Sequence, residues 1–90
     1  MNLSDQYFEN NQWIKHPDIN GWYLNVFEQL SNKFLTVRIG KINNGESFKL
    51  MFNSDGNEYV RIFKTVEEFE KFFNSRFYIP ESFSLDNWFN

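Results

Sequence analysis

The sequence predicts an α+β fold, in which a four-stranded, mostly antiparallel β-meander is packed on one face by a C-terminal α-helix, with a short N-terminal helix before the sheet. Three observations predict this fold. From Trp22 onwards, apolar residues recur at every second position, as in half-buried strands. The dipeptide Asn44-Gly45 is typical of a tight hairpin turn. Thr65 and Glu68 form a capping-box pattern at the start of an amphipathic segment.

The C-terminal helix is predicted over residues 65–76, after a strand at 58–63. Thr65 is expected to accept a hydrogen bond from the backbone N–H three residues later, which starts the helix. At about 100° per residue, the apolar side chains fall on one arc. They are Val66, Phe69, Phe72, Phe73 and Phe77. This single apolar face needs a sheet to bury it.

The N-terminal third is predicted to hold a short helix and a loop. Ser4 or Asp5 can cap the helix, because both side chains accept hydrogen bonds from free backbone N–H groups. The loop covers residues 11–21, which are rich in turn and helix-breaking residues. We expect Trp13 and Ile14 to hold it against the domain.

Two strands follow this loop, at residues 22–27 and 33–42, with a turn at 28–32 between them. Side chains alternate between the two faces of a strand, so each strand has one apolar face. The residues expected in the core are Trp22, Leu24 and Val26 from the first strand and Leu35, Val37 and Ile39 from the second.

Asn44-Gly45 fixes the register of the next hairpin. A type I′ turn needs positive φ at both central positions, which Asn-Gly tolerates. The turn places Asn43 opposite Glu46, Ile39 opposite Leu50 and Val37 opposite Phe52. Apolar residues of both strands then share one face.

A second turn is predicted at Asp55-Gly56. A two-residue loop there would pair Leu50 with Arg61 and direct a guanidinium toward the core. The three-residue loop Asp55-Gly56-Asn57 instead pairs Phe52 with Val60 and Leu50 with Ile62. Since a slip of one residue exchanges the two faces of a strand, the choice decides the whole surface. We expect the three-residue loop.

Composition and motifs argue against catalysis. The chain has 90 residues, no cysteine and a net charge of −3, which is typical neither of a nucleic-acid binder nor of a strongly charged DNA mimic. His16 is the only histidine, too few for a histidine metal site, and no Gly-x-Ser-x-Gly or phosphate-binding glycine motif occurs. We therefore expect no catalytic residue, no metal and no cofactor. Without a signal-peptide pattern or a membrane-spanning run, a cytoplasmic location is expected.

The predicted register places a basic and aromatic set on the face away from the helix. Its members are Arg38, Lys49, Met51, Tyr59 and Arg61, joined by Tyr23 and Phe27. Such a face can stack and neutralise a single-stranded nucleic acid or accept an acidic protein. It can equally be an ordinary solvated face whose cross-strand pairs steady the sheet. The twelve Phe, four Tyr and three Trp either build a core of rings or leave a patch for a partner.

The run Asp55-Gly56-Asn57-Glu58-Tyr59-Val60, with a helix after it, resembles one of the small prophage-encoded anti-CRISPR proteins that inhibit a CRISPR effector nuclease. The resemblance implies an inhibitor that binds by surface complementarity. It implies that Asp55, Asn57, Glu58 and Tyr59 lie at or near the contact.

The leading functional hypothesis is a non-catalytic protein-binding module, an inhibitor of a bacterial defence system encoded by a phage or mobile element. Two alternatives are a nucleic-acid-binding sheet that uses Arg38, Lys49, Tyr59 and Arg61, and an immunity protein or antitoxin. A homodimer through an exposed edge strand is a further expectation. The apolar residues of the C-terminal tail at 81–89 are expected to fold back onto the domain or onto a partner.

Overall fold

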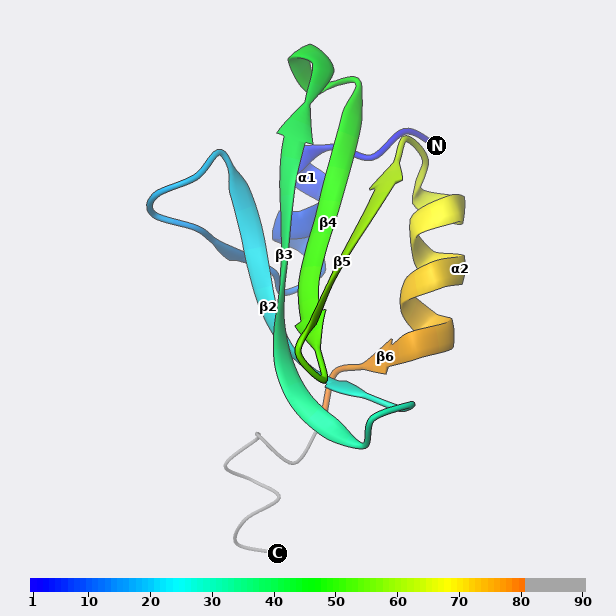
Figure 1. Ribbon diagram of the computed structural model, residues 1–90. Coiled ribbons are helices and arrows are strands. Elements are labelled where there is room, and N and C mark those ends of the chain that lie inside the picture. The colour runs from blue at the N-terminus through cyan, green and yellow to red at the C-terminus, as the bar shows by residue number, and fades with distance from the viewer. Residues whose placement is uncertain (81–90) are drawn as a thin grey trace, which may run out of the picture.

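The computed structural model describes residues 1–80 (Figure 1). In chain order its elements are α1 (Asp5–Asn10), β1 (Ile14–Lys15), β2 (Gly21–Glu28), β3 (Lys33–Ile42), the 3-10 turn η1 (Asn43–Gly45), β4 (Ser47–Ser54), β5 (Asn57–Phe63), α2 (Val66–Arg76) and β6 (Phe77–Tyr78). The α+β class and the antiparallel sheet are confirmed. Four strands were too few, because the sheet has six. The expected folding back of the tail concerns residues outside the described range.

The sheet has the order β1-β2-β3-β4-β5, and β6 pairs with the other end of β2. Both added strands have two residues, too few for an alternating pattern to reveal them. Ile14 pairs with Tyr23 and is exposed, so only Trp13 holds this segment as expected. Phe77 was expected on the helix, but it caps the end of α2, pairs with Glu28 and is buried in β6.

The helix starts are as predicted. Ser4 caps α1 by accepting a hydrogen bond from the N–H of Tyr7, and Thr65 caps α2 by accepting one from the N–H of Glu68. Phe69 of α2 is buried in the core. Local capping chemistry therefore sets where both helices begin.

The hairpin between β3 and β4 also has the predicted register. Ile39 lies opposite Leu50, and φ is 57° at Asn44 and 87° at Gly45. The N–H of Glu46 donates to the carbonyl of Asn43 at 3.1 Å, which closes the turn. The positive φ angles that Asn and Gly tolerate explain why this turn aligns the strands.

The hairpin between β4 and β5 contradicts the predicted three-residue loop. Ser54 pairs with Asn57, so the loop has two residues, and φ is 51° at Asp55 and 83° at Gly56. Leu50 consequently lies opposite Arg61, a pairing that was expected to bury a charge. That cost does not arise, because Arg61 is exposed on the last strand of the sheet. Its guanidinium lies 5.8 Å from the ring centre of Phe72.

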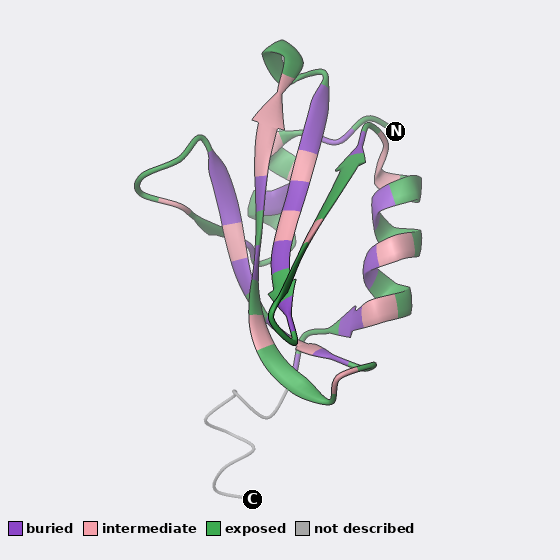
Figure 2. Cartoon of the chain, viewed as in Figure 1, coloured by how far each residue is buried: buried purple, intermediate pink, exposed green. Residues whose placement is uncertain are grey.

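The core lies between the sheet and the two helices and is built largely of aromatic rings. Figure 1 shows α1 behind β4, and Figure 2 shows the buried bands of β2 and β4. Phe8 of α1 has no exposed surface. Its ring contacts those of Tyr7, Trp13, Trp22, Phe48 and Phe69. Of the two alternatives for the aromatic residues, a ring-rich core is present, and several large apolar residues also stay exposed outside it.

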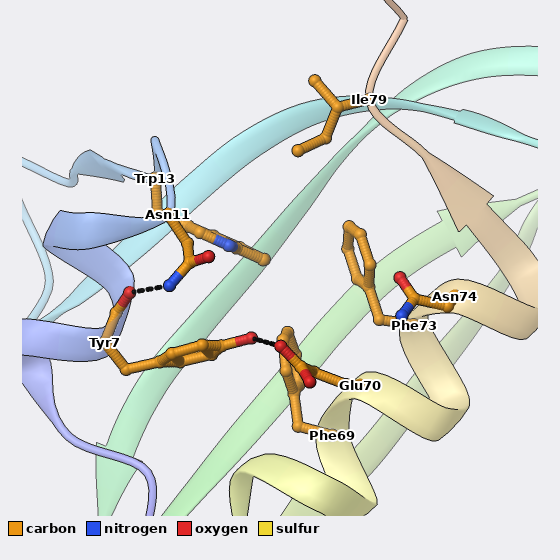
Figure 3. Close-up of a pocket in the computed structure, with 8 residues that line it drawn as sticks. All are labelled: Tyr7, Asn11, Trp13, Phe69, Glu70, Phe73, Asn74 and Ile79. Carbon is orange, nitrogen blue, oxygen red and sulfur yellow. Dashed lines mark hydrogen bonds between the residues drawn. The ribbon is translucent and has the colours of Figure 1, made fainter.

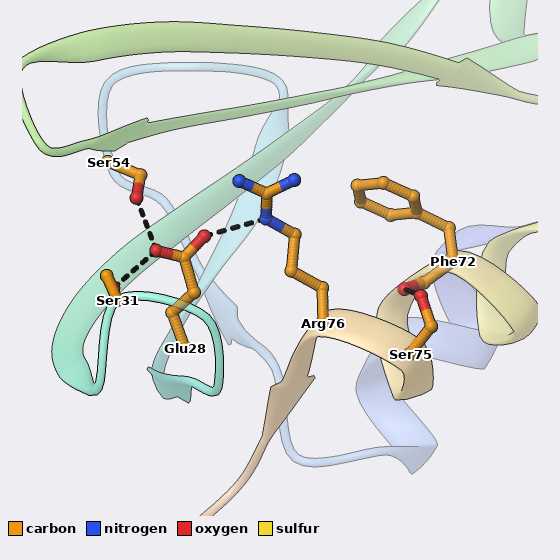
Figure 4. A network of polar contacts seen from close by, with 6 residues as sticks. All are labelled: Glu28, Ser31, Ser54, Phe72, Ser75 and Arg76. Atoms are coloured by element: carbon orange, nitrogen blue, oxygen red, sulfur yellow. Dashed lines mark hydrogen bonds and ion pairs between the residues drawn. The ribbon is translucent and has the colours of Figure 1, made fainter.

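A buried carboxylate joins β2, the turn after it, β4 and α2 (Figure 4). Glu28 is 0% exposed, and its Oε2 accepts from Nε of Arg76 at 2.7 Å. Its Oε1 accepts from the hydroxyl of Ser31 at 2.5 Å and from that of Ser54. The Arg76 guanidinium also lies 4.6 Å from the ring centre of Tyr59. A charge so deeply buried needs this full set of partners.

This network predicts a stability that depends on pH. Burial alone would raise the pKa of Glu28, but hydrogen bonds from Ser31, Ser54 and Arg76, together with the Arg76 charge, hold it below the ordinary 4.5. Because the folded-state pKa is lowered, the stabilisation is full above the unfolded-state pKa and is lost as pH falls through the folded one. We therefore expect the free energy of unfolding to decrease below about pH 4.5.

Urea denaturation at a series of pH values measures this effect, with Glu28→Gln as the test variant and the exposed Glu9→Gln as the control. Glu28→Gln should reduce the acid-induced loss, and Glu9→Gln should not. Part of the loss should persist, since the pKa of Asp5, beside Lys41, is lowered as well. An unchanged pH dependence in Glu28→Gln would contradict the role given to this carboxylate.

Candidate functional site

The face of the sheet opposite the helices carries one row of residues across five strands. Successive pairs join Ile14 to Tyr23, Tyr23 to Arg38, Arg38 to Met51 and Met51 to Val60. We call these five residues the open-face row. With strands about 4.8 Å apart, the row spans about 19 Å.

The open-face row combines exposed apolar side chains with a central cation. Ile14 is 48% exposed and Val60 is 39% exposed. In the next row, Ile62 is 56% exposed and lies opposite Lys49. Arg38 is exposed and has no ion pair within residues 1–80. Arg, Tyr and Met are among the residue types enriched at protein interfaces.

Polar residues border the row on one side. Thr36 pairs with Asn25 and donates a hydrogen bond to its side-chain oxygen at 2.6 Å, and Asn53 pairs with Glu58. Beyond this polar band, the ring of Phe27 lies 5.0 Å from those of Phe34 and Tyr78. Exposed apolar residues beside a polar border are a feature of protein interfaces.

The structure divides the residues that the sequence assigned to a partner site. Arg38 and Lys49 lie on the open face as predicted, and Glu58 belongs to its polar border. The predicted placement of Tyr59 and Arg61 on the open face was wrong, because the two-residue loop turns both toward the helix side.

The remaining two predicted residues lie at the β4–β5 hairpin, Asp55 in its loop and Asn57 at the start of β5. Asp55 accepts a hydrogen bond from Nζ of Lys33 at 3.1 Å, and Asn57 pairs with Ser54. Val60 and Ile62 were assigned to the core and instead lie exposed on the open face. Asp55-Gly56 was the signal that could have placed them, because Asp-Gly favours the same type I′ turn as Asn-Gly.

A small pocket lies between α1 and α2 (Figure 3). Its volume is about 120 Å³, and it is lined by Tyr7, Asn11, Trp13, Phe69, Glu70, Phe73, Asn74 and Ile79. The Tyr7 hydroxyl donates to the Glu70 carboxylate at 2.6 Å. Burial, then this hydrogen bond and the Glu70 charge, raise the pKa of Tyr7 well above its ordinary value. Pockets for small ligands are usually about 300–1,000 Å³, so this pocket is smaller than an ordinary ligand site.

Residues 1–80 contain no group of three or more side chains that could hold a metal ion. The ring nitrogen Nδ1 of His16 accepts from the backbone N–H of Asp18 at 3.0 Å. Among the described helices, none is long and apolar enough to cross a membrane.

Comparisons with protein-family models, with curated proteins and with solved structures found no match. The resemblance of residues 55–60 to anti-CRISPR proteins therefore stays a prediction. The geometry of the open face is the observation from which a function can be argued.

Proposed function

We propose that this chain is a non-catalytic protein-binding module that uses the open-face row, and that it serves a phage or mobile element as an inhibitor of a bacterial defence system. The single observation that carries the protein-binding part of the proposal is the row itself, with Arg38 at its centre and exposed apolar residues at both ends. The role as a defence inhibitor is proposed from the resemblance of residues 55–60. The apolar side chains at the ends of the row, Ile14 and Val60, are exposed to water, whereas most apolar side chains of β2 and β4 are buried in the core. An apolar surface with a polar border is typical of an interaction site.

Arg38 is the expected anchor of the interaction. It lies between Tyr23 and Met51, whose side chains would exclude water around its guanidinium when a partner covers the row. Arginine and tyrosine are common hot-spot residues, and the loss of one typically costs 2 kcal/mol or more of binding free energy, which is about 30-fold in affinity. An acidic partner surface suits this cation and the neighbouring Lys49.

The test is the plating efficiency of a phage on bacteria whose CRISPR effector nuclease targets it. We expect the wild-type chain to restore plaque formation and Arg38→Glu to remove most of this gain, since it reverses the charge of the anchor and the loss of such an anchor weakens binding by about 30-fold. Leu30→Asp is the matched control, because Leu30 is 78% exposed in the turn after β2. It should act like the wild type.

Equal thermal stability and equal expression of the three proteins exclude a folding effect. If the wild-type chain restores plaque formation against none of a panel of defence nucleases, the inhibitor proposal fails. If Arg38→Glu and Leu30→Asp act alike, the open face is not the binding surface.

The nucleic-acid alternative is weaker than the sequence suggested. Two of its four residues, Tyr59 and Arg61, lie on the helix side of β5, and Tyr59 is stacked on Phe52. Arg38 and Lys49 alone provide few phosphate contacts, whereas such binding usually needs many.

A further inference from the structure

The outer edge of β5 presents backbone groups that meet no strand within residues 1–80. β5 is the last strand in the sheet order. A two-residue hairpin closes on the hydrogen-bonded pair Ser54–Asn57, and hydrogen-bonded pairs then alternate along the ladder. The residues whose backbone N–H and C=O groups point outward are therefore Glu58, Val60 and Ile62. Nη1 of Arg61 reaches the Val60 carbonyl at 2.9 Å, as expected for a carbonyl on the free edge.

We propose that β5 pairs antiparallel with β5 of a second copy of this chain, with Val60 opposite Val60 of the second copy. The three outward residues are placed symmetrically about Val60, which is also the centre of the strand Asn57–Phe63. A two-fold pairing centred there sets Glu58 opposite Ile62 of the second copy, and all outward backbone groups find partners. Shifting the register by one pair in either direction leaves one of the three residues unpaired.

The ends of β5 limit the pairing to this stretch. The Asp55-Gly56 turn precedes the strand. After it, Asn2 bridges to Thr65, and the N–H of Leu3 donates to the Lys64 carbonyl at 2.9 Å. The N-terminal residues thus pair with the chain directly beyond Phe63. The free edge is short, and its centre is defined from both sides.

The side chains along this edge are complementary to a second copy of themselves. Val60 and Ile62 of both copies would meet at the seam and remove apolar surface from water. Glu58 would lie diagonally across from Lys64 of the second copy, so an acidic end meets a basic end. In the dimer, Arg61 would lie opposite Tyr59 of the second copy. Its hydrogen bond to the Val60 carbonyl would be replaced by a backbone hydrogen bond from the second copy. This charge order favours a second copy over an arbitrary strand.

The pairing joins two sheets into one and sets two open-face rows side by side. It goes beyond the proposed function, and the two share only Val60, which ends the open-face row and also lies at the seam; Arg38 lies on β3, two strands away from the seam. The test below uses purified protein with no partner, so it can fail while the plating experiment succeeds, and the reverse.

The absence of cysteine from the chain allows a direct test by disulfide cross-linking. In the proposed register, the Cα atoms of Val60 in the two copies are about 5.5 Å apart, within the range that a disulfide spans. Glu58 in the two copies is offset by four residues, about 13 Å along the strand. We therefore expect Val60→Cys to form a covalent dimer under mild oxidation at least tenfold faster than the matched control Glu58→Cys. Equal rates, or a faster Glu58→Cys, would overturn the register.

Analytical ultracentrifugation tests the dimer without a cross-link. The wild type should show a concentration-dependent dimer, which Val60→Pro should weaken by about tenfold or more because each copy loses an outward N–H donor. Proline is tolerated at such an edge position, since this N–H does not bond to β4. If Val60→Pro lowers the melting temperature, the comparison of Val60→Cys with Glu58→Cys decides whether the dimer forms. A wild type that stays monomeric at about 1 mM would overturn the proposal.

Discussion

Replacing Arg76 by alanine is expected to lower the free energy of unfolding by about 3–5 kcal/mol. The substitution leaves the carboxylate of Glu28, which is 0% exposed, without the guanidinium that binds it at 2.7 Å. It also removes the cation that lies 5.0 Å from the ring centre of Phe52. Small domains have a total stability of only about 5–15 kcal/mol, so a large part of it depends on this residue.

Urea denaturation measures the loss, and Arg61→Ala is the matched control. Arg61 also lies against a ring, that of Phe72, but it is exposed and binds a backbone carbonyl. Its replacement should cost about 1 kcal/mol or less. The double change Glu28→Gln with Arg76→Met should cost less than Arg76→Ala alone, because it leaves no unpaired charge. Equal losses for Arg76→Ala and Arg61→Ala would contradict the buried network.

Replacing Phe8 by alanine, as a single change, is expected to lower the free energy of unfolding by about 3–5 kcal/mol. Helix α1 has six residues and cannot persist on the strength of its own hydrogen bonds. The Phe8 ring attaches it to the core through rings from β2, β4 and α2. Its loss leaves a cavity at the centre of these contacts.

Thermal or urea unfolding of Phe8→Ala, compared with Leu30→Ala, measures this contribution. Leu30 is 78% exposed, so its truncation should change the free energy of unfolding by about 0.5 kcal/mol or less. A loss near 1 kcal/mol for Phe8→Ala would contradict the central position of this ring.

The two hairpins show which parts of the fold local sequence determines. At Asn44-Gly45, turn chemistry and apolar pattern agreed, and the predicted pairing of Ile39 with Leu50 is correct. At Asp55-Gly56, the predicted register was wrong by one residue. It was chosen to keep Arg61 out of the core, although Asp-Gly favours a two-residue turn. The predicted register required that every inward position on β5 be buried. At Arg61 it is not, because this long side chain reaches water past the ring of Phe72, whereas Phe63, which also points inward from β5, is buried.

This single error also decided how much of the candidate site could be predicted. Arg38, Lys49 and Met51 were placed on the correct face, because their register depends on the hairpin that was predicted correctly. Val60 and Ile62 were wrongly predicted to lie in the core, so the apolar end of the open-face row was not predicted. The pairing of Ile14 with Tyr23 through a two-residue strand leaves no periodic signal in the sequence.

The central claim is that the open-face row binds a protein. Its most direct measurement is quantitative capture of a binding partner from one lysate of a bacterium that carries the CRISPR effector nuclease. The immobilised proteins are the wild type, Arg38→Glu and Leu30→Asp. If the open-face row binds a protein, one species should be retained by the wild type and by Leu30→Asp and reduced about 30-fold on Arg38→Glu. Retention that is the same on all three proteins, or a species lost equally from both variants, would contradict the account.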